Sequence, residues 1–202
     1  MKKINSTHAQ SSIRQKQIID AALSCFSEKG FTETSIADIC RRAGASTGSV
    51  YHHFQSKGRL AAAVYLEGIR DYQSGMIQKL SEQESARDGI HAIVTYHLSW
   101  VEENPDWSQF LFQKRHADFM GDIETEMNHL NAEFAKAMSA WYQKCVEAGH
   151  LRIFPRDVLI SLILGPCQEF SRIYISGYAS SKVGDAARAI ANAVWASLGI
   201  DP

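Results

Sequence analysis

The stretch "ASTGSVYHHF" (residues 45–54) decides the fold, because it gathers small, hydroxyl, phenol and imidazole side chains on one short segment. Val50 and Phe54 are four residues apart, so a helix would turn both toward one core. On a helical wheel Gly48 and His52 then lie on the opposite face, which carries little bulk near its start. A helix with such an outward face can sit deep in a DNA major groove, and its side chains offer neutral donors to phosphates and base edges. The segment therefore predicts a DNA-reading helix.

A second short helix precedes this one and completes a helix-turn-helix pattern. Thr34 or Ser35 can cap its N-terminus, and Asp38 then supplies the acidic partner of a capping box. The helix ends at Gly44, which can take the positive φ that a tight turn needs. Ser46 is a candidate N-cap for the reading helix that follows.

The rest of the chain also has helical spacing, and no stretch alternates polar and apolar residues long enough to predict a sheet. The sequence predicts helices over roughly residues 12–29, 35–44, 46–54, 57–80, 86–103, 105–116, 120–148, 156–177 and 183–198. We therefore expect an all-α fold of about nine helices in two domains. Residues 1–55 would form a three-helix helix-turn-helix DNA-binding domain behind a basic N-terminal tail, and residues 56–202 a larger helical domain for ligand binding and dimerisation.

Composition predicts a cytoplasmic protein without a membrane partner. The 202 residues are 45% hydrophobic and 21% charged, as in ordinary globular proteins. No apolar run approaches the ~18 residues of a membrane span, and residues 1–17 lack the apolar core of a signal peptide.

The charge is divided unevenly along the chain. Residues 1–60 hold 9 Lys and Arg against 4 Asp and Glu, a net of +5, whereas residues 61–202 hold 12 against 18, a net of −6. This asymmetry predicts that the first part alone meets a polyanion. The acidic remainder argues weakly against a strongly anionic effector.

The segment "GFTETSIADICRRAGASTGSVYHHFQSKGRLAAAVY" (residues 30–65) resembles the N-terminal DNA-binding domain of the TetR family of transcriptional repressors. The "AGAS" turn, the "YHHF" ending and the following "SKGRL" match that family in order and spacing, while Cys40 replaces the usual Ala by another small residue. The resemblance implies that eight residues meet DNA: Thr34, Ser46, Thr47, Ser49, Tyr51, His52, His53 and Lys57. It implies phosphate contacts for Tyr51 and His53 and a base or sugar contact for His52. Two of the eight have structural alternatives, since His53 could pack against the core and Ser46 could serve only as a cap.

For the larger domain, the resemblance implies dimerisation and the binding of a small-molecule inducer. The partners expected are thus double-stranded operator DNA, an inducer of unknown identity and a second copy of the chain. The last helix repeats small and apolar residues at helical spacing, and with residues 156–177 it could form a four-helix bundle across a two-fold axis. That stripe would equally suit packing within one chain; it consists of Ala187, Ile190, Ala191, Val194 and Leu198.

The inducer pocket is predicted from bulky residues on the central helices, since ligand pockets are largely apolar with a few polar anchors. Aromatic residues at helical spacing are also typical of a core. The residues predicted to touch the ligand are Trp100, Phe112, His116, Trp141 and Phe170.

Other functions have weaker support in the sequence. Neither HxxxH nor HExxH occurs, and the four cysteines are scattered without CxxC spacing, so no metal site is predicted. Cys145 and Cys167 could pair in a redox sensor. No Gly-rich phosphate loop or GxSxG elbow points to an enzyme. We therefore predict a ligand-responsive transcriptional regulator, acting as a repressor and without a cofactor. The alternatives are a redox- or metal-responsive regulator of the same fold, or a helical enzyme.

Overall fold

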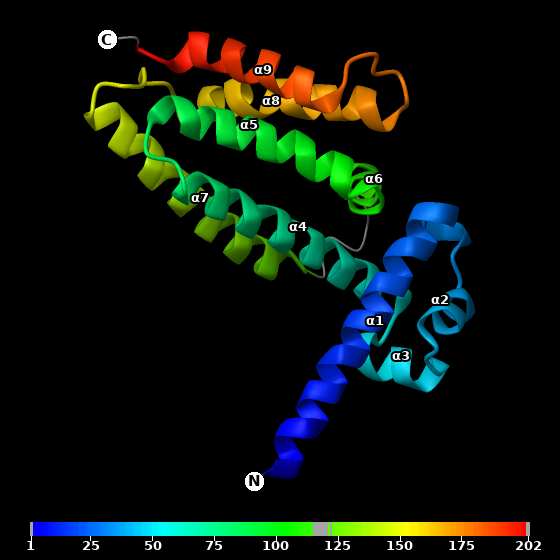
Figure 1. Ribbon diagram of the computed structural model, residues 1–202. Coiled ribbons are helices and arrows are strands. Elements are labelled where there is room, and N and C mark those ends of the chain that lie inside the picture. Colours follow the sequence, from blue (N-terminus) through cyan, green and yellow to red (C-terminus); the bar gives the residue numbers. More distant parts are fainter. Residues whose placement is uncertain (1, 115–120, 122, 201–202) are drawn as a thin grey trace. The chain divides into compact units, whose positions relative to one another are not determined.

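The computed structural model of the chain describes residues 2–114, 121 and 123–200, and side chains in residues 10–111, 121 and 123–200. Within these residues the structure contains nine α-helices and one isolated β-bridge. The chain divides into two compact units (Figure 1). The first unit comprises Met1–Ile69 and Gln109–Met127, and the second comprises Arg70–Ser108 and Asn128–Pro202.

The first unit is built on α1 (Lys2–Glu33), α2 (Ile36–Ala43) and α3 (Thr47–Phe54). α1 begins at Lys2, so the tail expected ahead of the first helix is helical instead. Near its end, Gly30 adopts a left-handed φ of 78° and kinks the chain. The core of this unit includes Ile18, Phe26 and Ile39, all 1% exposed or less, and Phe26 stacks on Phe110 at 5.5 Å between ring centroids.

Local capping explains why α2 and α3 begin and end where they do. Ser35 is the N-cap of α2, and its hydroxyl accepts the backbone N–H of Asp38 while the Asp38 carboxylate accepts the N–H of Ser35. Gly44 ends α2 in the left-handed conformation, with φ 58° and ψ 36°. The Ser46 hydroxyl then caps α3 by accepting the N–H of Ser49. These caps and turns confirm the elements that the sequence predicts around residues 35–54.

Six helices follow in the pattern expected from the sequence, and α4 (Lys57–Ser81) spans the boundary between the two units. The others are α5 (Ala86–Glu103), α6 (Pro105–Lys114), α7 (Glu124–Glu147), α8 (Arg156–Ile175) and α9 (Val183–Leu198). The boundary between the two compact units therefore falls inside α4, between Ile69 and Arg70. The domain boundary proposed from the sequence falls at residue 55, before this helix begins.

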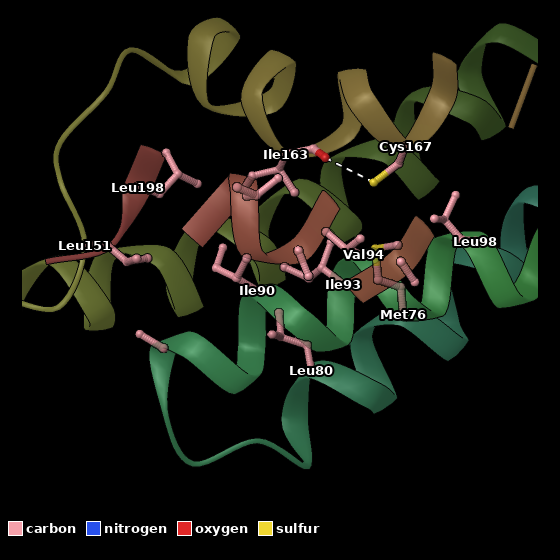
Figure 2. Packing of buried hydrophobic residues seen from close by; sticks show 14 of the residues in the cluster. Met76, Leu80, Ile90, Ile93, Val94, Leu98, Leu151, Ile163, Cys167 and Leu198 are labelled. Atoms are coloured by element: carbon pink, nitrogen blue, oxygen red, sulfur yellow. Dashed lines mark hydrogen bonds between the residues drawn. The ribbon is translucent and has the colours of Figure 1, made fainter. Parts of the chain in front are cut away.

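In the second unit, α5 packs against both α8 and α9 around one apolar core. Figure 2 shows Ile90 and Val94 of α5 in the same cluster as Ile163 of α8 and Leu198 of α9. The stripe on α9 that could have served a dimer belongs to this core. Ala187, Ala191, Val194 and Leu198 are each 3% exposed or less, and Ile190 packs beside them. The stripe is therefore used within the chain.

Tyr142 of α7 and Arg152 fix the loop between α7 and α8 and join it to the end of α9. The Tyr142 hydroxyl donates to the Arg152 carbonyl at 2.8 Å and accepts the Phe154 N–H at 3.0 Å, which fixes the loop between α7 and α8. The Arg152 guanidinium binds the carbonyls of Ala196 and Ser197 at the end of α9. Because cations stabilise helix C-termini, Arg152 joins the loop to the last helix.

A close approach of α7 to α5 depends on Gly89. An added Cβ at this position would overlap the indole ring of Trp141. Gly89→Ala should therefore destabilise the second unit by about 1–3 kcal/mol through overpacking, less the gain in helix propensity of up to ~1 kcal/mol. Urea denaturation would measure the change.

Gly184→Ala is the matched control for this substitution. Gly184 is also helical, and its added Cβ meets nothing within 4 Å. The control should leave the free energy of unfolding unchanged or slightly raised. Equal effects of the two variants would show that Trp141 does not pack on Gly89.

Candidate nucleic-acid interface and internal cavity

The orientation of α3 is set by two buried residues on one face. Val50 is 1% exposed and Phe54 5%, so both lie in the core of the first unit. Tyr51 is 46% exposed, and Thr47 and His52 are also exposed. Gly48 has only the Ser46 hydroxyl near its missing Cβ, at 3.9 Å, so the start of the opposite face is open. The arrangement leaves a narrow polar face that fits a major groove.

Three of the eight residues predicted to meet DNA either cap α3 or are half-buried. Ser46 is the N-cap of α3, as its structural alternative proposed. His53 is half-buried, with its ring 5.4 Å from that of His52 and 6.0 Å from that of Phe54. Ser49 is also half-buried. Capping or partial burial therefore gives each of these three side chains a structural role beside the predicted DNA contact.

Thr34 and Lys57 point into the protein. Thr34 is 1% exposed, and its hydroxyl lies 2.7 Å from the Gly30 carbonyl and 2.9 Å from that of Cys25. The Lys57 ammonium donates to the carbonyls of Phe31 and Thr34, both at 2.9 Å. It also reaches the Thr32 carbonyl at 3.3 Å and lies 4.6 Å from the centre of the Phe31 ring. Both side chains therefore hold the link between α1 and α2, where no local sequence pattern places them.

Residues outside the predicted set brace the turn. The Arg14 guanidinium donates to the carbonyls of Ala43 and Gly44 at the end of α2. Arg42 forms an ion pair with Glu28 of α1 at 2.6 Å, which lowers the pKa of the Glu28 carboxyl. The Cys40 thiol lies 3.8 Å from the Thr47 hydroxyl, so a small side chain stands where α2 and α3 cross. Arg14 and Arg42 thus hold α2 against α1, and the Cys40 contact joins α2 to the start of α3.

The second unit contains a cavity of about 440 Å³ between α4, α5, α7 and α8. Its wall is mainly apolar and includes Met76, Ile93, Phe134, Met138, Phe154 and Leu159. Among the predicted ligand residues, Trp141 lines it. Its size lies within the usual range of small-molecule sites, ~300–1,000 Å³.

Two of the other predicted ligand residues, Trp100 and Phe170, lie outside this cavity. Trp100 is 6% exposed in the core, and its indole N–H donates to Asp71 at 2.9 Å. Phe170 is half-buried and stacks on Tyr174 at 6.3 Å, and neither it nor Trp100 lines this cavity. The Phe112 side chain and His116 fall outside the part of the chain that the structure describes.

The cavity residues that sequence reasoning missed lie mostly on α7 and the start of α8. Phe134, Met138, Trp141 and Tyr142 recur at a spacing of three or four residues, which puts them on one helix face. That spacing was a usable signal. Arg156 had none, because its place beside the cavity depends on the loop that Tyr142 fixes.

Neither the metal nor the redox alternative gains support from this geometry. In the described residues, no three of the His, Cys, Asp and Glu side chains gather into a metal-binding group. Cys145 and Cys167 are free thiols in the core, and burial raises the pKa of Cys167 to about 12 and also raises that of Cys145. Both stay protonated near neutral pH, and a protonated thiol is a poor nucleophile.

A two-helix turn with an open outer face, carried by a chain whose second unit holds an internal cavity, defines a DNA-binding regulator of the helix-turn-helix class. Comparison with known proteins gives the family. Residues 18–64 match the family described as bacterial regulatory proteins, tetR family, and residues 65–200 match a tetracyclin repressor-like C-terminal domain. The chain belongs to the TetR family of transcription regulators.

Individual relatives agree with this assignment. The chain is 31% identical over 136 residues to the HTH-type transcriptional regulator BetI of Burkholderia ambifaria (strain MC40-6), covering 62% of this chain and 70% of the relative. Among solved structures, a TetR family regulator of Marinobacter aquaeolei VT8 matches with a TM-score of 0.77 at 16% identity, over 97% of this chain and 100% of the other. FadR from Bacillus subtilis, solved with stearoyl-CoA, matches with a TM-score of 0.76 at 15% identity, over 89% of this chain and 96% of the other. All three relatives are described as transcription regulators.

Substitutions at Tyr51 and Lys57 should have opposite effects. The first should weaken DNA binding without changing stability, and the second should lower stability. Tyr51 is 46% exposed, and the family resemblance implies a phosphate contact for its hydroxyl, so Tyr51→Phe should weaken operator binding about five-fold, the worth of ~1 kcal/mol, with unchanged stability. Lys57→Met removes a cation from three carbonyls and should lower the free energy of unfolding by about 1–3 kcal/mol. The salt dependence of DNA binding by the Lys57→Met variant should stay unchanged. Fluorescence anisotropy with a labelled operator and urea denaturation would measure the two effects.

The control is Tyr178→Phe, at a tyrosine that is 84% exposed in the second unit. It should change neither quantity. A fall of about one in the salt slope for Lys57→Met would show that Lys57 neutralises a phosphate, as the family resemblance implies.

Proposed function

We propose that this protein is a ligand-responsive repressor that binds a pseudo-palindromic operator as a homodimer and is released by a small-molecule inducer. The observation that carries the proposal is the outward face of α3, where His52 lies opposite the buried Val50 and Phe54 and Tyr51 lies beside it, both exposed. The protein would act in the cytoplasm, where it meets its operator. Two copies of α3 would enter major grooves one helical turn apart, ~34–36 Å, or further.

The proposed DNA contacts are divided by exposure. Thr47, Tyr51 and His52 would make the principal contacts, and Ser46, Ser49 and His53 would act from the margin. Thr34 and Lys57 would support the same surface by holding the link between α1 and α2, through the carbonyl contacts described above. Phosphate contacts fix orientation, while base-edge contacts give specificity.

The proposed dimer uses the outer faces of α8 and α9. α8 has a mean hydropathy of 1.2 over an 18-residue stretch, yet only 17% of that stretch is buried, and Val158 is 38% exposed. By length and composition alone α8 could cross a membrane, a test that helices of soluble proteins also pass. The outer face of α9 carries the small residues Ala189 and Ala193, which allow a close approach. Pairing of these faces would cover the apolar surface.

The cavity in the second unit is the proposed inducer site, with Trp141 as one contact. FadR of Bacillus subtilis was solved with stearoyl-CoA, so a relative of this fold carries a small molecule. An inducer lowers DNA affinity only if it binds the DNA-free conformation more tightly than the DNA-bound one. Phe112 and His116 are retained as proposed ligand contacts, whereas Trp100 and Phe170 would respond to the ligand without lining the cavity.

In-vitro selection from random duplex DNA tests this function. At a fixed salt near 0.15 M, where non-specific binding is limited, the protein should enrich a two-fold symmetric site. The symmetry follows from the proposed dimer, and the half-site spacing reports the separation of the two reading helices. A Val50→Asp variant, which loses the core contact of α3, serves as the unfolded-helix control. Recovery of no sequence by the folded wild-type protein would contradict the proposal.

A further inference from the structure

One end of the cavity differs chemically from the rest of its wall. Beside it lies a second, more polar hollow of about 470 Å³. The two hollows share Asn131, Ala135, Ser139 and Arg156, and the second adds Lys136 from α7. An apolar chamber therefore opens toward a rim of amide, hydroxyl and cationic groups.

The charges at this rim are of one sign. Arg156 and Lys136 line the hollows, and neither lining contains a carboxylate. Glu133 and Asp157 are close in sequence, but neither lines either hollow. This local cationic rim stands in a part of the chain whose net charge is −6 over residues 61–202, with 12 basic against 18 acidic residues.

Both cations lack an internal partner among the described residues. Other arginines of the same unit are paired: Arg172 with Glu169 at 2.6 Å and Arg188 with Asp185 at 3.7 Å. Lys136 and Arg156 have no such ion pair or hydrogen bond in the described part of the chain. Two unpaired cations at the mouth of an apolar cavity are suited to an anionic group brought by a ligand.

We propose that the inducer is an amphipathic carboxylate, whose apolar chain fills the cavity and whose carboxylate is bound by Arg156 and Lys136. This inference rests on the proposed function of the cavity. The planar Arg156 guanidinium can bind a carboxylate through two parallel hydrogen bonds, and the Lys136 ammonium adds a point charge. The amide of Asn131 and the hydroxyl of Ser139 supply neutral donors at the same rim. The apolar body gains binding free energy by leaving water beside Phe134, Met138 and Leu159.

Calorimetric titration of the whole protein with ligands of one chain length tests the headgroup. The ligands are decanoate, decanol, decylammonium and decyl phosphate, each kept below its micelle concentration. Decanoate should bind once per chain, and at least about ten-fold more tightly than decanol or decylammonium. A higher affinity for decyl phosphate than for decanoate would overturn the carboxylate assignment. An affinity for decylammonium equal to that for decanoate, or several decanoate molecules bound per chain, would also overturn it.

Variants at the rim locate the site. Arg156→Gln should weaken decanoate about ten-fold and leave decanol unchanged, because only the charged contact is lost. Arg188→Gln, an exposed arginine of α9, is the matched control and should leave both affinities unchanged. Ala135→Trp should fill the cavity and abolish both, with circular dichroism confirming the fold. Unchanged decanoate binding by Arg156→Gln would overturn the proposal.

The same protein samples separate this inference from the proposed function. If the protein binds its selected duplex but no decanoate, the ligand class is wrong and the regulator remains. If it binds decanoate at the rim but selects no duplex, the cavity chemistry stands and the regulatory function fails. Release of the duplex by decanoate, lost in Arg156→Gln, is the result expected when both are correct.

Discussion

The buried pair Val50 and Phe54 is the contact on which the DNA-binding surface depends. α3 has only eight residues, and a helix of that length is not stable alone in water. Its two apolar side chains, one turn apart, hold it to the first unit and also fix its rotation about its own axis. Once that rotation is fixed, Tyr51 and His52 are directed outward. Stability and recognition are therefore set by the same contact.

The surroundings of α3 are built to keep this arrangement. Capping hydroxyls at Ser35 and Ser46 satisfy backbone donors at the starts of α2 and α3, and Gly44 makes the turn between them. Thr34 and Lys57 satisfy carbonyls at the kinked end of α1. Polar residues that sequence similarity associates with DNA thus also satisfy the backbone behind the reading helix.

The sequence predicted the parts of this structure that depend on local patterns. Serine caps, the left-handed glycine and the alternation of buried and exposed positions on α3 are all readable within a few residues. The inward turn of Thr34 and Lys57 was not, because their acceptors are carbonyls at the end of α1 and in its link to α2, which for Lys57 lie up to 26 residues away in the chain. The α9 stripe shows a related limit: a pattern marks an apolar face but does not say whether α5 or a second copy covers it. Trp100 was ambiguous for the same reason, since core and pocket use the same side chains.

In the second unit, the net charge was a poor guide to the charge of the binding site. The acidic balance of this part of the chain argued against an anionic ligand, but a binding site responds to the charges that line it. Screening by salt limits the reach of exposed charges to about 10 Å, so Arg156 and Lys136 at the rim outweigh distant carboxylates. Only the fold brings these two residues from α8 and α7 to one place.

Photo-crosslinking to the selected operator tests the central claim, that the outer face of α3 meets DNA, most directly. The photoreactive amino acid p-benzoylphenylalanine would replace His52 in one sample and the exposed Tyr178 of the second unit in another. We expect crosslinks from position 52 at two symmetry-related places in the major groove, and none from position 178. Crosslinks from position 178 without any from position 52 would contradict that claim.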